Sequence, residues 1–254
     1  MTAVISLKNL VFSAASVALV VLLSVAVRAD GAYNVYFGGT SRSLPIYSVA
    51  REDKAVSITF DCAWGTDHTD DILQALAQYS VRATFFTVEF WTEKYPEYIS
   101  KISQAGHEIG THSKTHSHMS KQGAEEIRAE LESSSAAISG VTGKAVELFR
   151  APFGDYDDEL INTARGMGLY TIQWDVDSLD WKDLSAAEIV SRVTSRVQSG
   201  SIILMHNNGL HTAEAVPVIL DTLIARGYTF VPVGELIYRD NFTIDANGRQ
   251  QSCP

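Results

Sequence analysis

The sequence is poor in cysteine and in positive charge. Its 254 residues include only two cysteines, Cys62 and Cys253, so a framework of several disulfide bonds is excluded, and nothing in the sequence shows that the two approach each other. Lysine and arginine number 20 against 30 aspartates and glutamates, giving a formal net charge of -10. A nucleic-acid-binding protein is therefore not expected, because such proteins neutralise phosphates with basic side chains. Neutral and cationic polymers remain open as partners.

The one long apolar run lies near the N-terminus. Asn9 to Val27 follows Lys8 and contains no charged residue. This is close to the length of about 20 residues that a helix needs to span a bilayer, but Val27-Arg28-Ala29 also resembles a signal-peptide cleavage site. Residues 1–29 are therefore expected to be a membrane anchor or a cleaved signal peptide, with a buried core helix as the remaining alternative. Either of the first two makes the rest of the chain extracytoplasmic, anchored to the membrane or secreted into the cell envelope.

The remaining sequence predicts a single catalytic domain, since 46% of the residues are apolar and 20% are charged. Glycine, proline, serine and threonine without helical periodicity predict a linker and lead-in at residues 30–50. The catalytic domain is expected over 51–240, and a polar C-terminal tail over 241–254. No internal repeat is evident.

From residue 55 onward, short apolar strands alternate with amphipathic helical stretches. Ala55 to Phe60 precedes Asp70 to Tyr79, and Ala83 to Val88 precedes Pro96 to Gln104. This alternation predicts an α/β fold with parallel strands.

Ionisable residues follow five of the expected strands. The strands are Ala55–Phe60, Glu108–Thr111, Ala145–Phe149, Leu169–Val176 and Ser201–Met205, and the residues that follow them are Asp61, His112, Arg150, Asp177 with Asp180, and His206. In barrel-type α/β folds the carboxyl ends of the strands meet on one face, so we expect these side chains to share one site. Taken singly, each has an ordinary explanation, such as a helix N-cap for an aspartate.

Three histidines occur within seven positions, in THSKTHSHM. The spacing of His112 and His116 places both imidazoles on one side of a helical turn, where they could share a metal ion such as zinc. A polar helix start is the alternative. His118 is expected to be a surface residue. A catalytic zinc usually has three protein ligands and an open position, so another strand end should supply the third ligand.

Five motifs occur in a fixed order: TFDCAWG at 59–65, HSKTH at 112–116, RAPFG at 150–154, DSLDW at 177–181 and LMH at 204–206. This series resembles the polysaccharide deacetylases, carbohydrate esterase family 4, also called the NodB-homology family. The resemblance covers roughly Leu44 to Tyr238 and is most like the sporulation-associated bacterial subgroup. It implies a distorted (β/α) barrel.

The resemblance also implies a role for each matching residue. Asp61 would be the catalytic base, held ionised by Arg150, and His206 the catalytic acid, tuned by Asp180. His112 and His116 would bind the metal. The substrate groove would be formed by Pro152, Phe153, Gly154, Trp181 and Leu204, with Leu204 facing the acetyl methyl group. Singly, Arg150 could be a surface salt-bridge residue, Trp181 and Leu204 core residues, and RAPFG a turn.

One position departs from the family pattern. The second of two consecutive aspartates in the first motif is the usual third metal ligand, and here that position is Cys62. A thiolate could complete a zinc site, but a cysteine at the end of an apolar strand is also a common core residue. The alternatives are Asp67 or water as the third ligand, or no bound metal.

The sequence thus predicts a hydrolase of carbon–nitrogen bonds other than peptide bonds. It would use a divalent metal, zinc by preference, to remove acetyl groups from an N-acetylated glycan such as peptidoglycan of the cell wall or spore cortex. The glycan would be its partner, with the membrane as a second partner if the N-terminal segment is retained. Three alternatives stay open: a catalytically weakened glycan-binding member of the same fold, a deacetylase of another polymer such as chitin oligomers, and a structural envelope protein.

Overall fold

The computed structural model describes residues 42–253, and the chain divides into two compact units at Arg42 and Ser43. The predicted anchor or signal peptide, residues 1–29, lies outside the described residues, as does linker segment 30–41. Across residues 42–253, no helix has both the length and the apolar character needed to cross a membrane. The second unit contains the predicted catalytic domain.

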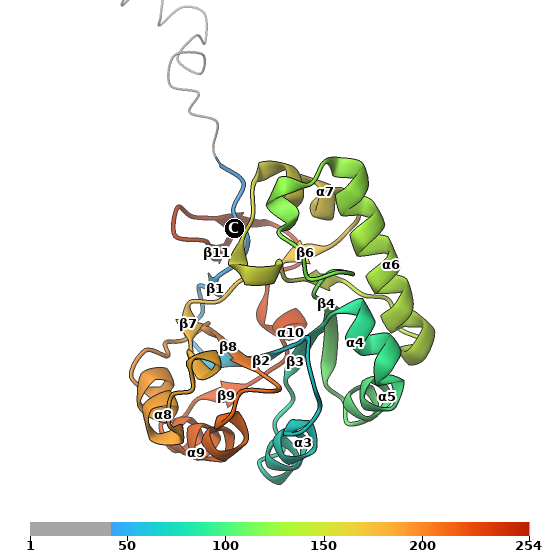
Figure 1. The fold of residues 1–254 in the computed structure, drawn as a ribbon. Coiled ribbons are helices and arrows are strands. Elements are labelled where there is room, and N and C mark those ends of the chain that lie inside the picture. The colour runs from blue at the N-terminus through green and yellow to red at the C-terminus, as the bar shows by residue number, and fades with distance from the viewer. Residues whose placement is uncertain (1–41, 254) are drawn as a thin grey trace, which may run out of the picture. The chain divides into compact units, whose positions relative to one another are not determined.

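Strands and helices alternate along this unit, as the sequence pattern predicts (Figure 1). The strands are β1 (Ser48–Val49), β2 (Ala55–Cys62), β3 (Thr84–Thr87), β4 (Glu108–Thr111), β5 (Leu148–Phe149), β6 (Tyr170–Thr171), β7 (Val176–Asp177), β8 (Ile202–His206), β9 (Thr229–Phe230), β10 (Phe242–Ile244) and β11 (Arg249–Ser252). The helices are α3 (Thr69–Gln78), α4 (Glu89–Lys94), α5 (Pro96–Gln104), α6 (Ala124–Thr142), α7 (Asp158–Gly166), α8 (Ala186–Thr194), α9 (Thr212–Ala225) and α10 (Val233–Leu236). Short 3-10 turns, η1 (Met119–Lys121), η2 (Pro152–Gly154) and η3 (Asp180–Lys182), lie in the loops.

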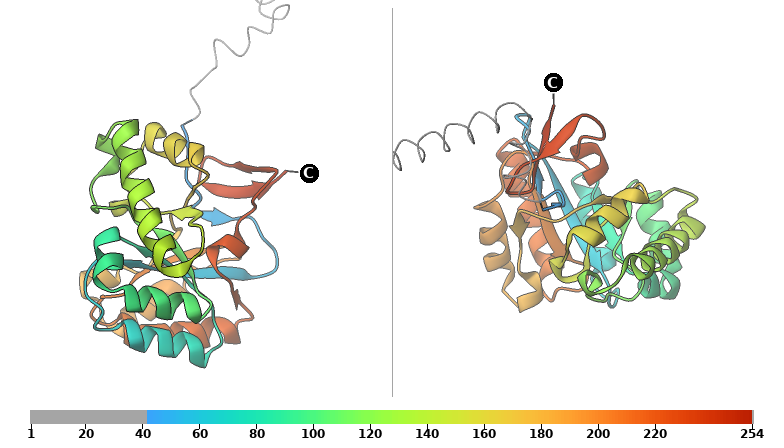
Figure 2. Two further views of the ribbon diagram at one scale, coloured as in Figure 1. Left: turned by 90° about the vertical axis from the view of Figure 1, so that its right-hand side faces the viewer. Right: turned by 90° about the horizontal axis from the view of Figure 1, so that it is seen from above.

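The main sheet is parallel and curled. Its order is β6-β5-β4-β3-β2-β8-β7, with β9 also paired to β2. Strands β6 and β7 lie at opposite edges, although only residues 172–175 separate them in the chain. In a flat sheet the two edges would be roughly 29 Å apart at ~4.8 Å per strand, whereas five Cα steps reach at most about 18 Å. The sheet must therefore bend its edges toward each other. This curled half-barrel, with helices on its outer side (Figures 1 and 2), confirms the predicted distorted barrel.

The same geometry corrects one expected strand. Leu169 to Val176 was predicted as a single strand, but it is divided into β6 and β7, which pair with different neighbours, β5 and β8. The segment between them crosses the opening between the sheet edges, where Ile172 forms a bridge with Ile46. The sequence pattern does not reveal such a break, because each short strand has one buried and one partly buried residue.

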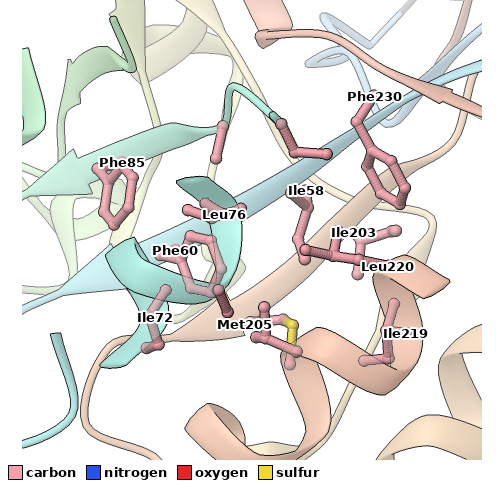
Figure 3. Packing of buried hydrophobic residues seen from close by; sticks show 14 of the residues in the cluster. Ile58, Phe60, Ile72, Leu76, Phe85, Ile203, Met205, Ile219, Leu220 and Phe230 are labelled. Carbon is pink, nitrogen blue, oxygen red and sulfur yellow. The ribbon is translucent and has the colours of Figure 1, made fainter. Parts of the chain in front are cut away.

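Strand β2 forms the centre of the domain, and all eight of its residues are buried. Successive side chains of a strand point to opposite faces. On one face, Ile58, Phe60 and Cys62 belong to the large apolar cluster that packs against the surrounding helices. Figure 3 shows Ile58 and Phe60 beside residues of α3 and α9. On the other face, Thr59 and Asp61 both accept hydrogen bonds from the buried side chain of Arg150.

The C-terminal segment is more ordered than the expected polar tail. Residues 241–254 contain β10 and β11, which pair antiparallel with each other, while β11 pairs in parallel with β1. Most of its residues are polar, but Ile244 packs against an apolar cluster, and the buried side chain of Gln250 bonds the backbone of Tyr238 through both its oxygen and its nitrogen. This segment therefore belongs to the domain.

Candidate active site

The carboxyl ends of the parallel strands bring the predicted residues together. Asp61 on β2 is paired in register with His206 at the end of β8. Thr111 of β4 pairs with Phe149 of β5, so the residues that follow them, His112 and Arg150, are neighbours too. A cleft of about 840 Å³ opens here, and its lining includes Asp61, His112, His116, Asp177, Asp180 and His206. Arg150 lies fully buried and bonds Asp61.

Asp61 and Arg150 form a buried ion pair. Arg150 Nη1 donates hydrogen bonds to Asp61 Oδ1 and to Thr59 Oγ1, both at 2.8 Å. The guanidinium also lies 4.1 Å from the ring centre of Phe86. Burial by itself raises the pKa of Asp61, but the charge and hydrogen bond of Arg150, together with smaller effects of His112 and His206, outweigh burial, and the pKa is lowered overall. Asp61 is therefore ionised at neutral pH and able to accept a proton.

His206 and Asp180 form a second pair. His206 Nδ1 lies 2.7 Å from Asp180 Oδ1, and the backbone N–H of His206 donates to Asp180 Oδ2 at 2.7 Å. Thr212 Oγ1 donates to the same oxygen at 2.6 Å. A Cβ atom on Gly209 would lie 2.3 Å from that hydroxyl oxygen, so a glycine is needed at this point of the loop. Burial lowers the pKa of His206. The hydrogen bond and the charge of Asp180 together raise it by more than burial lowers it, so the pKa is raised overall.

The rings of His112 and His116 meet edge to face, with ring centres 5.0 Å apart. His112 Nδ1 donates to the carbonyl oxygen of Arg150 at 2.8 Å, which leaves the Nε2 lone pair free. That Nε2 atom lies 3.5 Å from Asp61 Oδ2. Burial lowers the pKa of His112 and lowers that of His116 to about 4. Both imidazoles are therefore neutral at pH 7, the form that binds metals.

The loop that carries His116 is tied to helix α6. Glu130 is buried, and its carboxylate accepts hydrogen bonds from the backbone N–H groups of Lys114 and Thr115, both at 2.9 Å, and from Thr115 Oγ1 at 2.7 Å. Ser113 Oγ accepts the N–H of His116 at 2.9 Å. Ser113 and His116 have φ angles of 74° and 56°, which few residues other than glycine adopt. These hydrogen bonds hold the tight turn that directs His116 toward His112.

Cys62 does not face the two histidines. Its side chain is fully buried in the apolar cluster with Phe60, and the nearest hydrogen-bond acceptor of its Sγ atom is the Phe60 carbonyl oxygen at 3.8 Å. Burial raises the pKa of the Cys62 thiol well above its ordinary value, with a smaller effect from Asp61. A thiol that stays protonated on the far face of β2 is a poor zinc ligand. The position of Cys62 thus argues against it among the alternatives for the third ligand, which were Cys62, Asp67, water or no bound metal.

The donor atoms of the cleft fit a divalent metal only in part. The two neutral imidazoles are suitable ligands, and the bond from His112 to the Arg150 carbonyl is the kind of support that metal-binding histidines have. Among residues 42–253, however, no group of three histidine, cysteine, aspartate or glutamate side chains is arranged to hold a metal. Asp67, the other predicted alternative, lines the cleft without completing such a group.

Large apolar side chains frame the cleft. Phe153, Trp181 and Leu204 line it, as predicted, but Pro152 and Gly154 are not part of the lining. Pro152 is buried. Trp64 and Leu210, which had been assigned no role, also line the cleft. The exposed fractions are 61% for Trp64, 57% for Phe153, 55% for Trp181 and 56% for Leu210, so these residues are not ordinary core. Exposed aromatic rings beside acidic side chains suit a polar, ring-containing ligand.

The other residues of this site differ in how far they can be predicted from the sequence. Trp64 stands within the TFDCAWG motif, where a large apolar side chain next to a strand end is a usable signal. Glu130 and Thr212 carry no such signal, because their contacts with the 113–116 loop and with Asp180 arise only when distant segments pack together.

The family model for polysaccharide deacetylases matches residues 48–172. The chain is 31% identical over 196 residues to a peptidoglycan-N-acetylglucosamine deacetylase of Bacillus cereus, covering 75% of this chain and 92% of that protein. It is also 31% identical over 193 residues to the uncharacterised protein YlxY of Bacillus subtilis, covering 76% of this chain and 60% of YlxY. The chain thus spans less than two thirds of that relative's length.

Among solved structures, BA3943 of Bacillus anthracis, described as a pseudoenzyme of the same carbohydrate esterase family, superposes with a TM-score of 0.74 and 32% identity. The match covers 77% of this chain and 69% of that one. A mutant of BA3943 with restored enzymatic activity is equally similar in fold. These likenesses do not identify the sporulation-associated subgroup. Together with the ordered motifs and the curled barrel, they show that the chain belongs to the polysaccharide deacetylase family.

Proposed function

We propose that this protein removes acetyl groups from the N-acetylated sugars of peptidoglycan by amide hydrolysis, with release of acetate. One observation carries the proposal: a carboxylate with a lowered pKa and a histidine with a raised pKa occupy paired positions on neighbouring strands in one cleft. General acid–base hydrolysis requires this combination of an ionised base and a protonated acid at the same pH.

Each group has one task in the proposed reaction. Asp61 accepts a proton from the water that attacks the acetamide carbonyl. His206 donates a proton to the amine nitrogen as the carbon–nitrogen bond breaks, because an amine departs poorly without one. Asp180 keeps the imidazolium charged and oriented through the 2.7 Å bond to Nδ1. Leu204, buried in the cleft lining beside this histidine, would contact the acetyl methyl group.

The family is typically metal-dependent. In this chain His112 and His116 would hold a divalent metal, with zinc suited to neutral imidazoles, and the remaining positions would be open to water and substrate. Such an ion would supply a Lewis acid for the amide oxygen. Two protein ligands bind more weakly than three, so we expect activity to depend on added metal.

The substrate class is supported by the relatives and by the cleft. Peptidoglycan N-acetylglucosamine is the substrate named for the B. cereus protein that is 31% identical. The cleft lining contains no lysine or arginine, which suits a neutral glycan better than an anionic one. Action on peptidoglycan would require an extracytoplasmic position, for which the apolar run Asn9 to Val27 is the sequence support.

A second candidate is a glycan-binding protein with weak or no catalysis. It is favoured by one observation, the orientation of Cys62 away from the two histidines, and by the likeness to a pseudoenzyme. Binding of glycan would then be retained without release of acetate.

The test uses the full-length chain and N-acetylated peptidoglycan, with a chelator or with added zinc, measuring released acetate and binding to the polymer. We expect acetate release that increases with metal and is absent for Asp61→Asn. Binding without acetate release at any metal concentration would favour the second candidate. Faster release of acetate from chitin oligomers than from peptidoglycan would show that peptidoglycan is not the preferred substrate.

A further inference from the structure

Four aromatic and imidazole rings form a continuous row beside the cleft. Trp64 lies 4.9 Å from His116, His116 lies 4.7 Å from Phe153, and Phe153 lies 4.3 Å from His118, measured between ring centres. The first two contacts are edge-on, whereas His118 stacks on Phe153 with an angle of 20° between the planes. His118, which does not line the cleft, thus contacts a residue that does.

Phe153 needs support from its surroundings. Its backbone has φ 62° and ψ 3°, a left-handed conformation that is unfavourable for a bulky side chain. Such a conformation persists only when neighbouring groups hold it. The ring is 57% exposed, so few buried contacts are available, and the ring contacts found for it are those with His116 and His118.

His118 is itself fixed to the turn that carries Phe153. Its Nδ1 atom donates to Asp155 Oδ2 at 3.1 Å, and Ser120 Oγ donates to the same oxygen at 2.6 Å. Asp155 follows η2 directly, and its N–H donates to the Pro152 carbonyl oxygen at 3.2 Å. The loop containing His118 therefore contacts this turn twice, by ring stacking and by a carboxylate bond.

We propose that His118 is a positioning residue for glycan binding: by stacking on Phe153 and bonding Asp155, it holds the Phe153 ring in the cleft wall. The proposal rests on the proposed function for the identity of the ligand. Stacking covers one face of Phe153, and the large exposed fraction leaves the ring available to the apolar face of a sugar. His118 is not part of the cleft lining that contains the reacting groups, and its Nδ1 is bonded to Asp155. Its loss should therefore weaken binding and leave the chemical step nearly unchanged.

The test compares His118→Ala, His118→Phe and His211→Ala in the full-length chain. His118→Phe retains a stacking ring without the bond to Asp155. His211 is the matched control, a partly exposed histidine whose Nδ1 lies 3.3 Å from Glu214 and for which no aromatic ring contact is found within residues 42–253. Measurements of kcat and KM on N-acetylated glycan are combined with crystal structures of the variants, which report the Phe153 backbone without reference to activity.

We expect His118→Ala to raise KM roughly three- to tenfold, the range that corresponds to one lost aromatic contact, with kcat within about twofold. His118→Phe should restore most of the binding, and His211→Ala should match the wild type. In the His118→Ala crystal, Phe153 should leave the left-handed region. An unchanged Phe153 backbone, an unchanged KM, or a loss in kcat alone would overturn the proposal. If the wild type has no glycan activity, the proposed function fails, and the Phe153 conformation in the variants still decides the positioning role.

Discussion

Asp61 and His206 are direct partners in the register of the parallel strands β2 and β8. Each has its own buried partner of opposite charge, Arg150 for the carboxylate and Asp180 for the imidazole. The two partners come from different parts of the chain, so each can be replaced separately, although Asp61 and His206 also shift each other's pKa through their charges. This arrangement makes separate predictions for each pair.

The first prediction concerns Arg150. Replacing it with Met leaves the carboxylate of Asp61 buried without its counter-ion, so the pKa of Asp61 should rise, and the acid limb of the pH profile of kcat/KM should move to higher pH. Removing one partner of a buried pair should also lower the free energy of unfolding by about 3–5 kcal/mol.

The control is Arg82→Met, which breaks the half-exposed pair with Glu235 and should cost no more than about 1 kcal/mol. If Arg150→Met does not fold, Arg150→Lys keeps the charge and should retain an acid limb near that of the wild type. An acid limb that does not move in the Met variant would contradict the pairing.

A second prediction concerns Cys62. Because its thiol packs in the apolar cluster, Cys62→Ala should leave zinc affinity unchanged and lower the free energy of unfolding by about 1 kcal/mol. Calorimetric titration with zinc and chemical denaturation measure the two effects. Cys253→Ala is the control, since that cysteine is exposed and should affect neither quantity. Loss of zinc binding in Cys62→Ala alone would restore the thiolate as a ligand.

The position of Cys62 illustrates what the sequence could reveal. Alternation along β2 places Cys62 on the same face as Ile58 and Phe60, and Asp61 on the opposite face, so its burial was readable from the strand pattern. Side-chain chemistry alone leaves Cys62 open as a zinc ligand or as a core residue, and the strand pattern favours the core residue. The convergence of strand ends was also predictable, because parallel strands of a barrel end on one face.

Other features depended on contacts that a sequence does not contain. The break between β6 and β7 follows from the curling of the sheet, and the ordered C-terminal strands depend on the pairing of β11 with β1 and with β10. Glu130 clamps the 113–116 loop through its hydrogen bonds to Lys114 and Thr115. This clamp requires α6 to pack beside the loop, and Glu130 is 15 residues from Thr115 in the sequence.

A third prediction follows from that clamp. Glu130→Ala removes the acceptor of two backbone N–H groups and one hydroxyl, so the turn carrying His116 should relax. We expect zinc affinity to fall about 10- to 100-fold, as for other groups that orient metal ligands, and stability to fall by about 2 kcal/mol. Glu132→Gln, an exposed position on the same helix, is the control. Equal zinc affinity in Glu130→Ala and the wild type would exclude the clamp as a determinant of metal binding.

The last prediction concerns His206 as the general acid. Its raised pKa keeps it protonated at neutral pH, whereas the lowered pKa of Asp61 keeps the base ionised, so kcat/KM should be bell-shaped in pH. Rate falls at low pH as Asp61 is protonated, and at high pH as His206 loses its proton. In the wild type, the hydrogen bond and the negative charge of Asp180 raise the pKa of His206. Asp180→Asn weakens the hydrogen bond and removes the charge, so this pKa should fall. The alkaline limb should therefore move to lower pH, with the acid limb nearly unchanged.

His206→Ala should lower kcat about 100- to 10,000-fold while glycan binding is nearly retained. The matched control is His211→Ala, which should keep both limbs and the rate. Near wild-type turnover in His206→Ala would mean that another group protonates the amine, and the two-group mechanism would have to be abandoned.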